Sequence, residues 1–334
     1  MQIVAFTAAS LAALGIAFIA PRAAWADSAP VISGPYVHEN LAVYFVHGPS
    51  APGPVPLTLQ EALAKGSVRV VETGEVNELK VENTGGEDVF IQSGDIVKGG
   101  QQDRVLTMSF VLPPKSGEVG LAAFCVEHGR WSQRGTESAY KFDSSDQMIA
   151  TKELKMAAKR DVSQARVWGE VSVAQEKLSD SVAAPVQSAR SQSSLQLALE
   201  NDKVQASAAD YVEKLSSIVE GQNDVIGFVF AINGKLNSAD VYGATWIFSP
   251  FWPRLLKTAA IEAVAERTSA EKCEPVSIAS AAEFLTASEK GSETINEVTT
   301  RTHMLQRESE KSLFFETRDM AHNALWIHRN YLMK

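Results

Sequence analysis

Cysteine is scarce in this chain, which leaves too few cysteines for a zinc site built on them. Among 334 residues only Cys125 and Cys273 are cysteines, and the six histidines form no H-x-H or H-x3-H pattern. Structural zinc sites combine four such ligands at short spacings. The sequence therefore predicts no zinc site. In an oxidising compartment the two cysteines could form one disulfide, and burial as two free thiols is the alternative.

Runs of basic residues interleaved with aromatic residues are also absent. The chain has 31 Lys and Arg against 40 Asp and Glu, for a formal net charge of −9. A protein this acidic has no electrostatic attraction to nucleic acid or to anionic lipid surfaces. We therefore expect no nucleic-acid partner and no membrane-surface partner for the mature chain.

The one long hydrophobic run lies near the first residue. Ile3 to Ala20 is almost entirely apolar, and Ala24-Trp25-Ala26 places small residues where a signal peptidase reads them. We predict a signal peptide over residues 1–26, cleavage before Asp27, and an exported protein, periplasmic or secreted. No Lys or Arg precedes the apolar run, so an uncleaved anchor is the competing interpretation. Because the segment holds Arg22 and no acidic residue, its removal leaves a charge of −10.

The first part of the mature chain carries closely spaced strand patterns. A helix is predicted at Thr58–Ala64, ending at Gly66, and the most regular strand pattern is Val105–Leu112, which alternates between two faces over its length. Short strands in quick succession are typical of an antiparallel sandwich or barrel-like sheet, predicted here for residues 32–142. The other predicted strands are Leu41–Val46, Val68–Val71, Glu78–Glu82, Asp88–Gln92 and Val119–Glu127.

From about Ser144 the hydrophobic period becomes helical, with a loop predicted over Ser179–Ser194. Asn233-Gly234 predicts a hairpin between Val225–Ile232 and Lys235–Tyr242. We predict one α+β domain over residues 27–334, helical and mixed from 143 to 334, with a sheet shared between its halves. The later predicted elements are a helix carrying Tyr211 and Leu215, a helix over Arg254–Arg267 with Pro253 at its first position, a helix capped by Ser280 to Glu283, and strands Ile295–Thr299, Leu313–Glu316 and Leu325–Leu332.

Two motifs at the ends of predicted strands concentrate polar chemistry. The first runs from Gly94 to Arg104 as G-D-I-V-K-G-G-Q-Q-D-R, and the second from Cys125 to Trp131 as C-V-E-H-G-R-W. Strand ends on a rigid scaffold can hold polar groups toward a ligand. The glycine-rich motif is not followed by a helix, so it is neither a dinucleotide nor a P-loop fingerprint, and no cofactor is expected.

These motifs resemble those of a bacterial domain family first described in association with ADP-ribosylglycohydrolases and with rhodanese/phosphatase proteins. The resemblance extends over roughly Ile32 to Leu332 and includes V-W-x-x-V at Val167 to Val171. Asp95 stands where the longer Glu is expected, which shortens its reach. The family's activity is unassigned. Its associations imply a link to NAD or ADP-ribose metabolism.

The first functional hypothesis is a ligand-binding domain for an anionic molecule, nucleotide-like or ADP-ribose-like. Arg104 and Arg130 would supply forked donors, Gln101 would orient the ligand, and Trp131 would stack on a ring. Gly99 and Gly100 would allow the close backbone turn. The alternative is that each arginine pairs internally with Asp95, Asp103 or Glu127 and stabilises a turn.

The second hypothesis is a hydrolase with Glu127 as general base, assisted by Asp95. Catalysis by Cys125 is disfavoured, because a neighbouring carboxylate raises the pKa of a thiol. The third hypothesis is an exported structural or partner-binding module, for which the sequence identifies no partner. Asp240, Trp326 and His328 are weaker site candidates, each equally explained by a place on a strand.

Overall fold

The fold is described from a computed structural model, which defines residues 30–334 except 51–52, 54 and 269–273. The predicted signal peptide and Cys273 lie outside the described residues. Seven α-helices occur in the described ranges: α1 (Leu59–Ala64), α2 (Lys152–Lys159), α3 (Gln164–Ser181), α4 (Leu195–Leu199), α5 (Asp202–Leu215), α6 (Thr245–Ala265) and α7 (Ile278–Ser288).

The largest sheet joins the first strands of the described chain to its last ones. Its eight antiparallel strands combine two N-terminal strands with six that follow residue 224, and β2 pairs directly with β12. The order is β1 (Val31–His38), β2 (Leu41–His47), β12 (Val225–Ile232), β13 (Lys235–Tyr242), β17 (Leu325–Met333), β16 (Ser312–Asp319), β15 (Thr302–Glu308) and β14 (Ser292–Glu297).

A second sheet, of six antiparallel strands, forms most of the remaining N-terminal half. Its order is β11 (Phe142–Met148), β7 (Asp95–Gly99), β8 (Arg104–Leu106), β10 (Glu118–Cys125), β5 (Glu78–Asn83) and β4 (Val68–Glu72). Its two edge strands approach each other, because Val71 of β4 forms a bridge with Lys141, the residue before β11. The sheet is therefore strongly curved, and the predicted α+β class with a barrel-like N-terminal sheet is confirmed.

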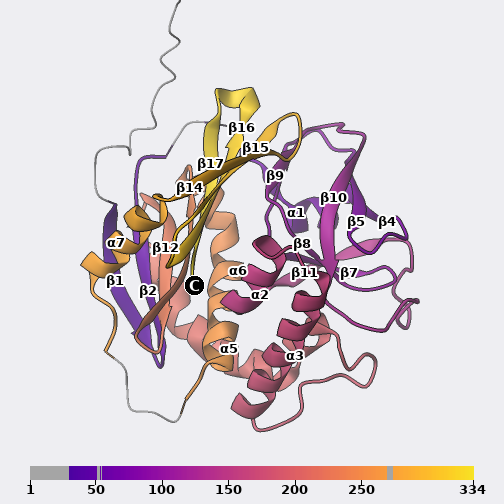
Figure 1. The fold of residues 1–334 in the computed structure, drawn as a ribbon, viewed down its shortest axis with the longest axis horizontal. Coiled ribbons are helices and arrows are strands. Elements are labelled where there is room, and N and C mark those ends of the chain that lie inside the picture. Colours follow the sequence, from indigo (N-terminus) through magenta and orange to yellow (C-terminus); the bar gives the residue numbers. More distant parts are fainter. Residues whose placement is uncertain (1–29, 51–52, 54, 269–273) are drawn as a thin grey trace, which may run out of the picture.

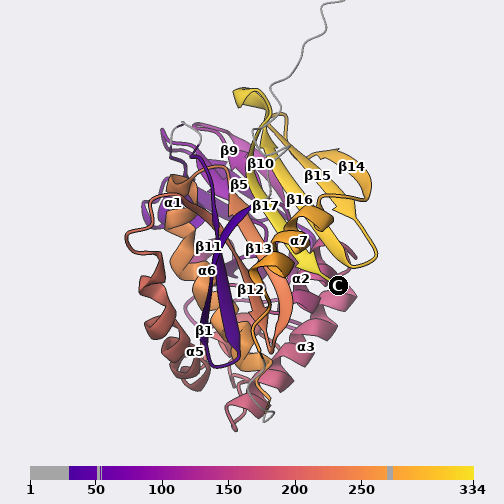
Figure 2. The ribbon, with the colours of Figure 1, turned by 90° about the vertical axis from the view of Figure 1, so that its left-hand side faces the viewer.

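The main core lies between these two sheets and contains α6. In Figure 1 this helix runs through the middle of the molecule, with the large sheet on one side and the curved sheet on the other. Phe228 and Phe230 of β12, Phe251 of α6 and Phe124 of β10 belong to one buried cluster. Figure 2 shows α7 on the outer face of the large sheet, where it covers a second cluster. β12 is consequently buried on both faces.

The prediction of one continuous strand at Val105–Leu112 is wrong, because this segment is divided between two sheets. β8 ends at Leu106, and β9 (Phe110–Leu112) pairs with β6 (Val89–Ile91), which in turn pairs with β3 (Leu57–Thr58). Ser93 causes the break, because its Oγ donates to the carbonyl of Thr107 and its N–H donates to Ser109 Oγ, both at 2.9 Å. The alternation of apolar and polar residues in Val105–Leu112 could not reveal that the Ser93 side chain, from outside this segment, interrupts its strand pairing.

Two later predictions also need correction, and one strand was missed. α6 begins at Thr245 and continues through Pro250 and Pro253, because its buried apolar side chains stabilise the helix despite two missing N–H donors. α7 is capped by Ser277, whose hydroxyl accepts from the N–H of Ser280 at 3.1 Å. The strand β15, which pairs with both β14 and β16, was not predicted.

Candidate functional site

The two predicted motifs do meet in space. Cys125 of β10 pairs with Arg104 of β8, so the turn after β7 and the loop after β10 leave the curved sheet side by side. Gly99 and Gly100 have φ values of +115° and +56°, and a Cβ on Gly100 would lie 2.2 Å from the ring of Phe142. Glycine is therefore required by the turn itself, without reference to a ligand.

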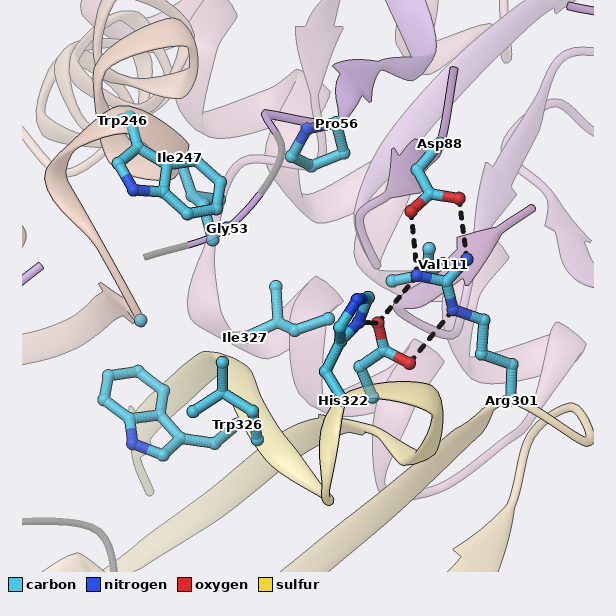
Figure 3. Close-up of a pocket in the computed structure, with 13 residues that line it drawn as sticks. Gly53, Pro56, Asp88, Val111, Trp246, Ile247, Arg301, His322, Trp326 and Ile327 are labelled. Carbon is cyan, nitrogen blue, oxygen red and sulfur yellow. Dashed lines mark hydrogen bonds and ion pairs between the residues drawn. The ribbon is translucent and has the colours of Figure 1, made fainter. Parts of the chain in front are cut away.

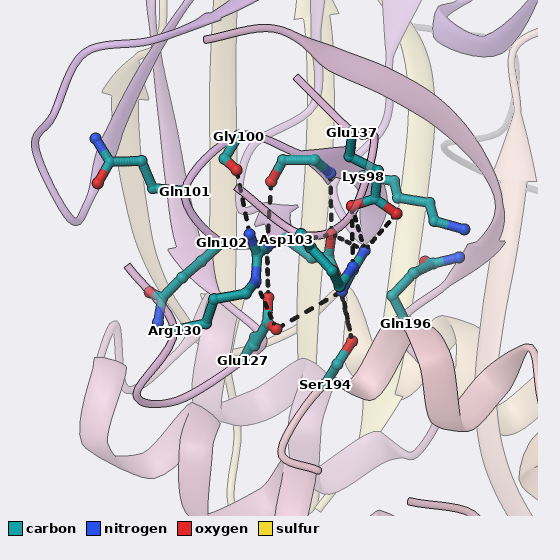
Figure 4. Close-up of polar contacts among 12 residues, drawn as sticks. Lys98, Gly100, Gln101, Gln102, Asp103, Glu127, Arg130, Glu137, Ser194 and Gln196 are labelled. Atoms are coloured by element: carbon teal, nitrogen blue, oxygen red, sulfur yellow. Dashed lines mark hydrogen bonds and ion pairs between the residues drawn. The ribbon is translucent and has the colours of Figure 1, made fainter. Parts of the chain in front are cut away.

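A buried cluster of opposite charges fills the space between these two segments, and we call it the charge cluster: Asp103, Glu127, Arg130, Arg134 and Glu137 (Figure 4). Arg130 forms two 2.7 Å contacts with Glu127 and also donates to the carbonyls of Gly99, Gly100 and Ser132. Arg134 donates to both oxygens of Asp103 at 2.7 and 2.9 Å and pairs with Glu137 at 2.9 Å. The cluster is held together by its own members.

The two buried carboxylates of the charge cluster have opposite pKa shifts. Burial raises the pKa of Asp103, and Arg134 only partly offsets this effect. Burial also acts to raise the pKa of Glu127, but hydrogen bonds from Arg130 and Ser191 and the two guanidinium charges outweigh it, so the pKa is lowered. Both carboxylate side chains are 0 % exposed. Glu127 is thus an ionised carboxylate enclosed by arginines, with its oxygens already in contact.

Arg104 lies in a separate ion pair beside the charge cluster. Its guanidinium donates to the carbonyl of Gln102 at 2.9 Å and to Glu72 at 3.3 Å, and its side chain is 0 % exposed. The half-exposed Trp131 ring covers it at 5.4 Å. Trp131 therefore stacks on an arginine of its own chain. A ligand could reach Arg104 only if this indole moved.

Asp95 and Gln101 are not directed at Glu127. Asp95, at the far end of β7, accepts from Arg254 of α6 at 2.8 Å and from the N–H of Gln92 at 3.2 Å. The Gln101 side chain points away from the charge cluster in Figure 4. The backbone N–H of Gln101 donates to Glu72 at 3.2 Å. The carboxylate that lies beside Glu127 is instead Asp103, whose N–H donates to Glu127 at 3.3 Å.

Cys125 is buried and its thiol chemistry is suppressed. Burial raises the pKa of the Cys125 thiol to about 11, and the nearby charge of Arg104 only partly opposes this effect. A thiol with that pKa is almost entirely protonated at neutral pH and is a poor nucleophile. Because Cys273 lies outside the described residues, the disulfide stays a prediction.

A second candidate site lies at the end of α2, where a pocket of about 240 Å³ opens between the curved sheet and the large sheet. We call it the Lys159 pocket. Its walls include Met108, Phe124 and Phe315, and the exposed Asn77 and Val162 lie at its rim. Lys159 is the only charged residue that lines it.

The Lys159 amine reaches a polar centre on the large sheet. It donates to Asn330 at 2.6 Å and lies 4.2 Å from the centre of the Phe315 ring. Asn330 donates to Asp240 at 3.0 Å, and His328 contacts the same Asp240 oxygen at 2.9 Å. β13 and β17 are neighbours, which places these three polar residues on one face, toward α2.

Lys159 and Lys155 differ in their charged contacts. In the described part of the chain no carboxylate lies within ion-pair distance of its amine, whereas Lys155, one turn earlier, pairs with Glu262 of α6 at 3.1 Å. Burial and the charge of Lys155 lower the pKa of Lys159 to about 8, against the opposing charge of Asp240. Burial also lowers the pKa of His328, which favours the neutral imidazole. This centre was missed because its residues are far apart in sequence.

A third hollow, of about 80 Å³, lies between Trp246 and Trp326 and is bordered by Arg301 (Figure 3). Arg301 donates to both oxygens of Asp88 at 2.6 and 2.8 Å and to both oxygens of Asp319 at 2.7 and 3.0 Å. His322 contacts the same Asp319 at 2.8 Å. Four of the five N–H groups of Arg301 therefore hold the two carboxylates, and its charge is matched within the chain.

No metal centre is apparent in the ranges that the structure describes, since no three His, Cys, Asp or Glu residues group as ligands. Within the same ranges no helix has the length and apolarity of a membrane span.

The described residues form an α+β domain built on a sheet shared between its two ends, with a buried charge cluster and a pocket lined by Lys159. A sequence profile matches residues 30–332. The chain belongs to the ARG and Rhodanese-Phosphatase-superfamily-associated Protein domain family, as its motifs predicted. No curated protein and no solved structure matches it significantly.

Proposed function

We propose that the protein is an exported ligand-binding domain that takes a small anionic molecule with an apolar body in the Lys159 pocket. The observation that carries this proposal is one amine without a carboxylate partner among the described residues, lining a pocket with apolar walls. Ligand sites typically combine a mostly apolar surface with a few polar groups that fix orientation. A carboxylate ligand would give the Lys159 amine the direct ion pair that it lacks within the described residues.

The charge cluster is the less favourable place for the ligand. Arg104 and Arg130 already donate to carboxylates and carbonyls of the chain, so an anion would have to displace these contacts. Breaking a buried ion pair costs several kcal/mol. A pocket of about 240 Å³ is also smaller than the clefts that usually hold drug-sized ligands, which favours a compact acid over a molecule as large as ADP-ribose.

Phenylacetate is a suitable first probe, because it combines one carboxylate with an apolar ring. We expect it to raise the melting temperature of the protein in proportion to the logarithm of its concentration. Lys159→Met should weaken binding about 10- to 100-fold, the usual effect of losing a charge-assisted hydrogen bond. Calorimetric titration of both proteins measures the change.

Lys152→Met is the matched control, since Lys152 begins the same helix and does not line the pocket. It should bind phenylacetate as the wild type does, and the neutral phenylacetamide should bind the wild type weakly. ADP-ribose belongs in the same screen. If ADP-ribose binds and Lys159→Met has no effect, the ligand site lies elsewhere and this proposal is wrong.

Export is tested separately, by the first residue of the mature protein. When the full chain is produced in a bacterium, we expect the soluble protein outside the cytoplasm to begin at Asp27. Intact-mass measurement identifies the terminus directly. Recovery of the uncut chain in the membrane fraction would instead support the anchor interpretation.

A further inference from the structure

We propose that the Lys159 amine binds carbonyl compounds covalently, forming an imine with an aldehyde or a 2-oxo acid that enters the pocket. This inference deepens the proposed function and rests on it, because the same pocket must first admit the ligand. It adds a chemical class of ligand and a reaction to what would otherwise be reversible anion binding.

The position of the amine supports this reaction. Lys159 lines the outer pocket of about 240 Å³ and also a small internal cavity of about 30 Å³. Its amine donates to Asn330 of the internal cavity at 2.6 Å and lies 4.2 Å from the centre of the Phe315 ring, which lines the outer pocket. The amine donates to a neutral acceptor, Asn330. Three other half-buried lysines, Lys98, Lys155 and Lys177, pair with carboxylates, Lys98 with Glu200 at 2.7 Å. Lys159 can therefore turn toward a ligand at the cost of one hydrogen bond.

The protonation state favours attack as well. Groups facing the amine are Lys155 on its own helix, Glu262 of α6, Asp240 of β13 and His328 of β17. Burial and the charge of Lys155, opposed by that of Asp240, lower the lysine pKa to about 8. At pH 7 roughly one molecule in ten then carries the neutral amine, against roughly four in ten thousand for an ordinary lysine. Lysines activated in this way are the usual nucleophiles in imine chemistry.

The reaction needs no outside oxidant or reductant. The lone pair of the neutral amine forms a bond to the carbonyl carbon, and a proton moves from nitrogen to oxygen to give a carbinolamine. The C–O bond then breaks, the hydroxyl leaves as water with one added proton, and a protonated imine remains. Ammonium and carbonyl thus give iminium and water, and the apolar walls formed by Met108, Phe124 and Phe315 favour release of that water.

Phenylpyruvate with cyanoborohydride is the direct test, because reduction fixes the imine as a stable secondary amine. We expect one adduct per chain, mapped to Lys159 by peptide mass spectrometry and suppressed by excess phenylacetate. Lys152→Met should be labelled like the wild type. Lys159→Met should lose the adduct.

Lys159→Arg separates the two proposals, because arginine keeps the charge and cannot form this imine. It should retain phenylacetate binding within about tenfold and lose trapping completely. If phenylacetate binds and the wild type is labelled no faster at Lys159 than at Lys152, the imine proposal fails while the binding proposal stands. If phenylacetate does not bind and no selective adduct forms, both proposals fail.

Discussion

Replacing Arg134 by methionine should lower the free energy of unfolding by about 3–5 kcal/mol, the usual effect of removing one partner of a buried ion pair. Arg134 contacts both oxygens of Asp103 and both oxygens of Glu137, and it lies 3.6 Å from Glu127. Without it the enclosed Asp103 and Glu127 would repel each other. Denaturant unfolding of the variant and the wild type measures the difference.

Arg190→Met is the control, because Arg190 is exposed and should tolerate the change within about 0.5 kcal/mol. Adding Asp103→Leu to Arg134→Met should restore part of the loss, since an apolar pair removes the uncompensated charge. The recovery will be incomplete because Asp103 also accepts from the N–H of Gly99 at 3.0 Å. An Arg134→Met variant as stable as the wild type would contradict a structural role and favour Glu127 as an available base.

The two sequence motifs contribute residues to the charge cluster, and none of their residues lines the Lys159 pocket. The C-V-E-H-G-R-W segment supplies Glu127 and Arg130 to one buried network, and the glycine-rich segment supplies Asp103. Ser194 extends the network, since it donates to Asp103 at 3.0 Å and caps α4. The most distinctive sequence of the chain therefore connects three segments of the fold, and the Lys159 pocket lies elsewhere.

Local signals in the sequence predicted local structure well. Thr58 and Glu61 form the reciprocal capping pair of α1, and Asn233-Gly234 turns the hairpin with positive φ values of 51° and 69°. Both depend on residues a few positions apart. The same is true of the 2.7 Å pairing of Arg130 with Glu127, three residues before it, which was one of the alternatives for that arginine.

Contacts between distant residues could not be predicted in this way. Asp95 pairs with Arg254, 159 positions later, and this pairing directs it away from Glu127. Asp240 and His328 were each noted on a strand, but only the pairing of β13 with β17 brings them together. Lys159 joins them from a helix whose periodic pattern showed an apolar face and gave no reason to single out its last residue.

Lys159 should also change measurably how the free energy of unfolding depends on pH. Its pKa is about 8 in the folded protein, below the ordinary 10.5. Below pH 8 both states carry the proton, and the folded state bears the full cost of the buried charge. Between pH 8 and 10.5 the folded state loses the proton first, so the unfolded state binds more protons and stability rises with pH.

We therefore expect the free energy of unfolding of the wild type, minus that of Lys159→Met, to increase over this window by about 1–2 kcal/mol. Full burial would give roughly 3 kcal/mol, and solvent contact of the side chain reduces it. Taking the difference cancels the contributions of the other lysines and tyrosines to the pH dependence, because they titrate in both proteins. Lys152→Met should run parallel to the wild type across the same range. A flat difference for Lys159→Met would mean that its amine is solvated like any surface lysine, and the neutral nucleophile on which imine formation depends would then be rare at neutral pH.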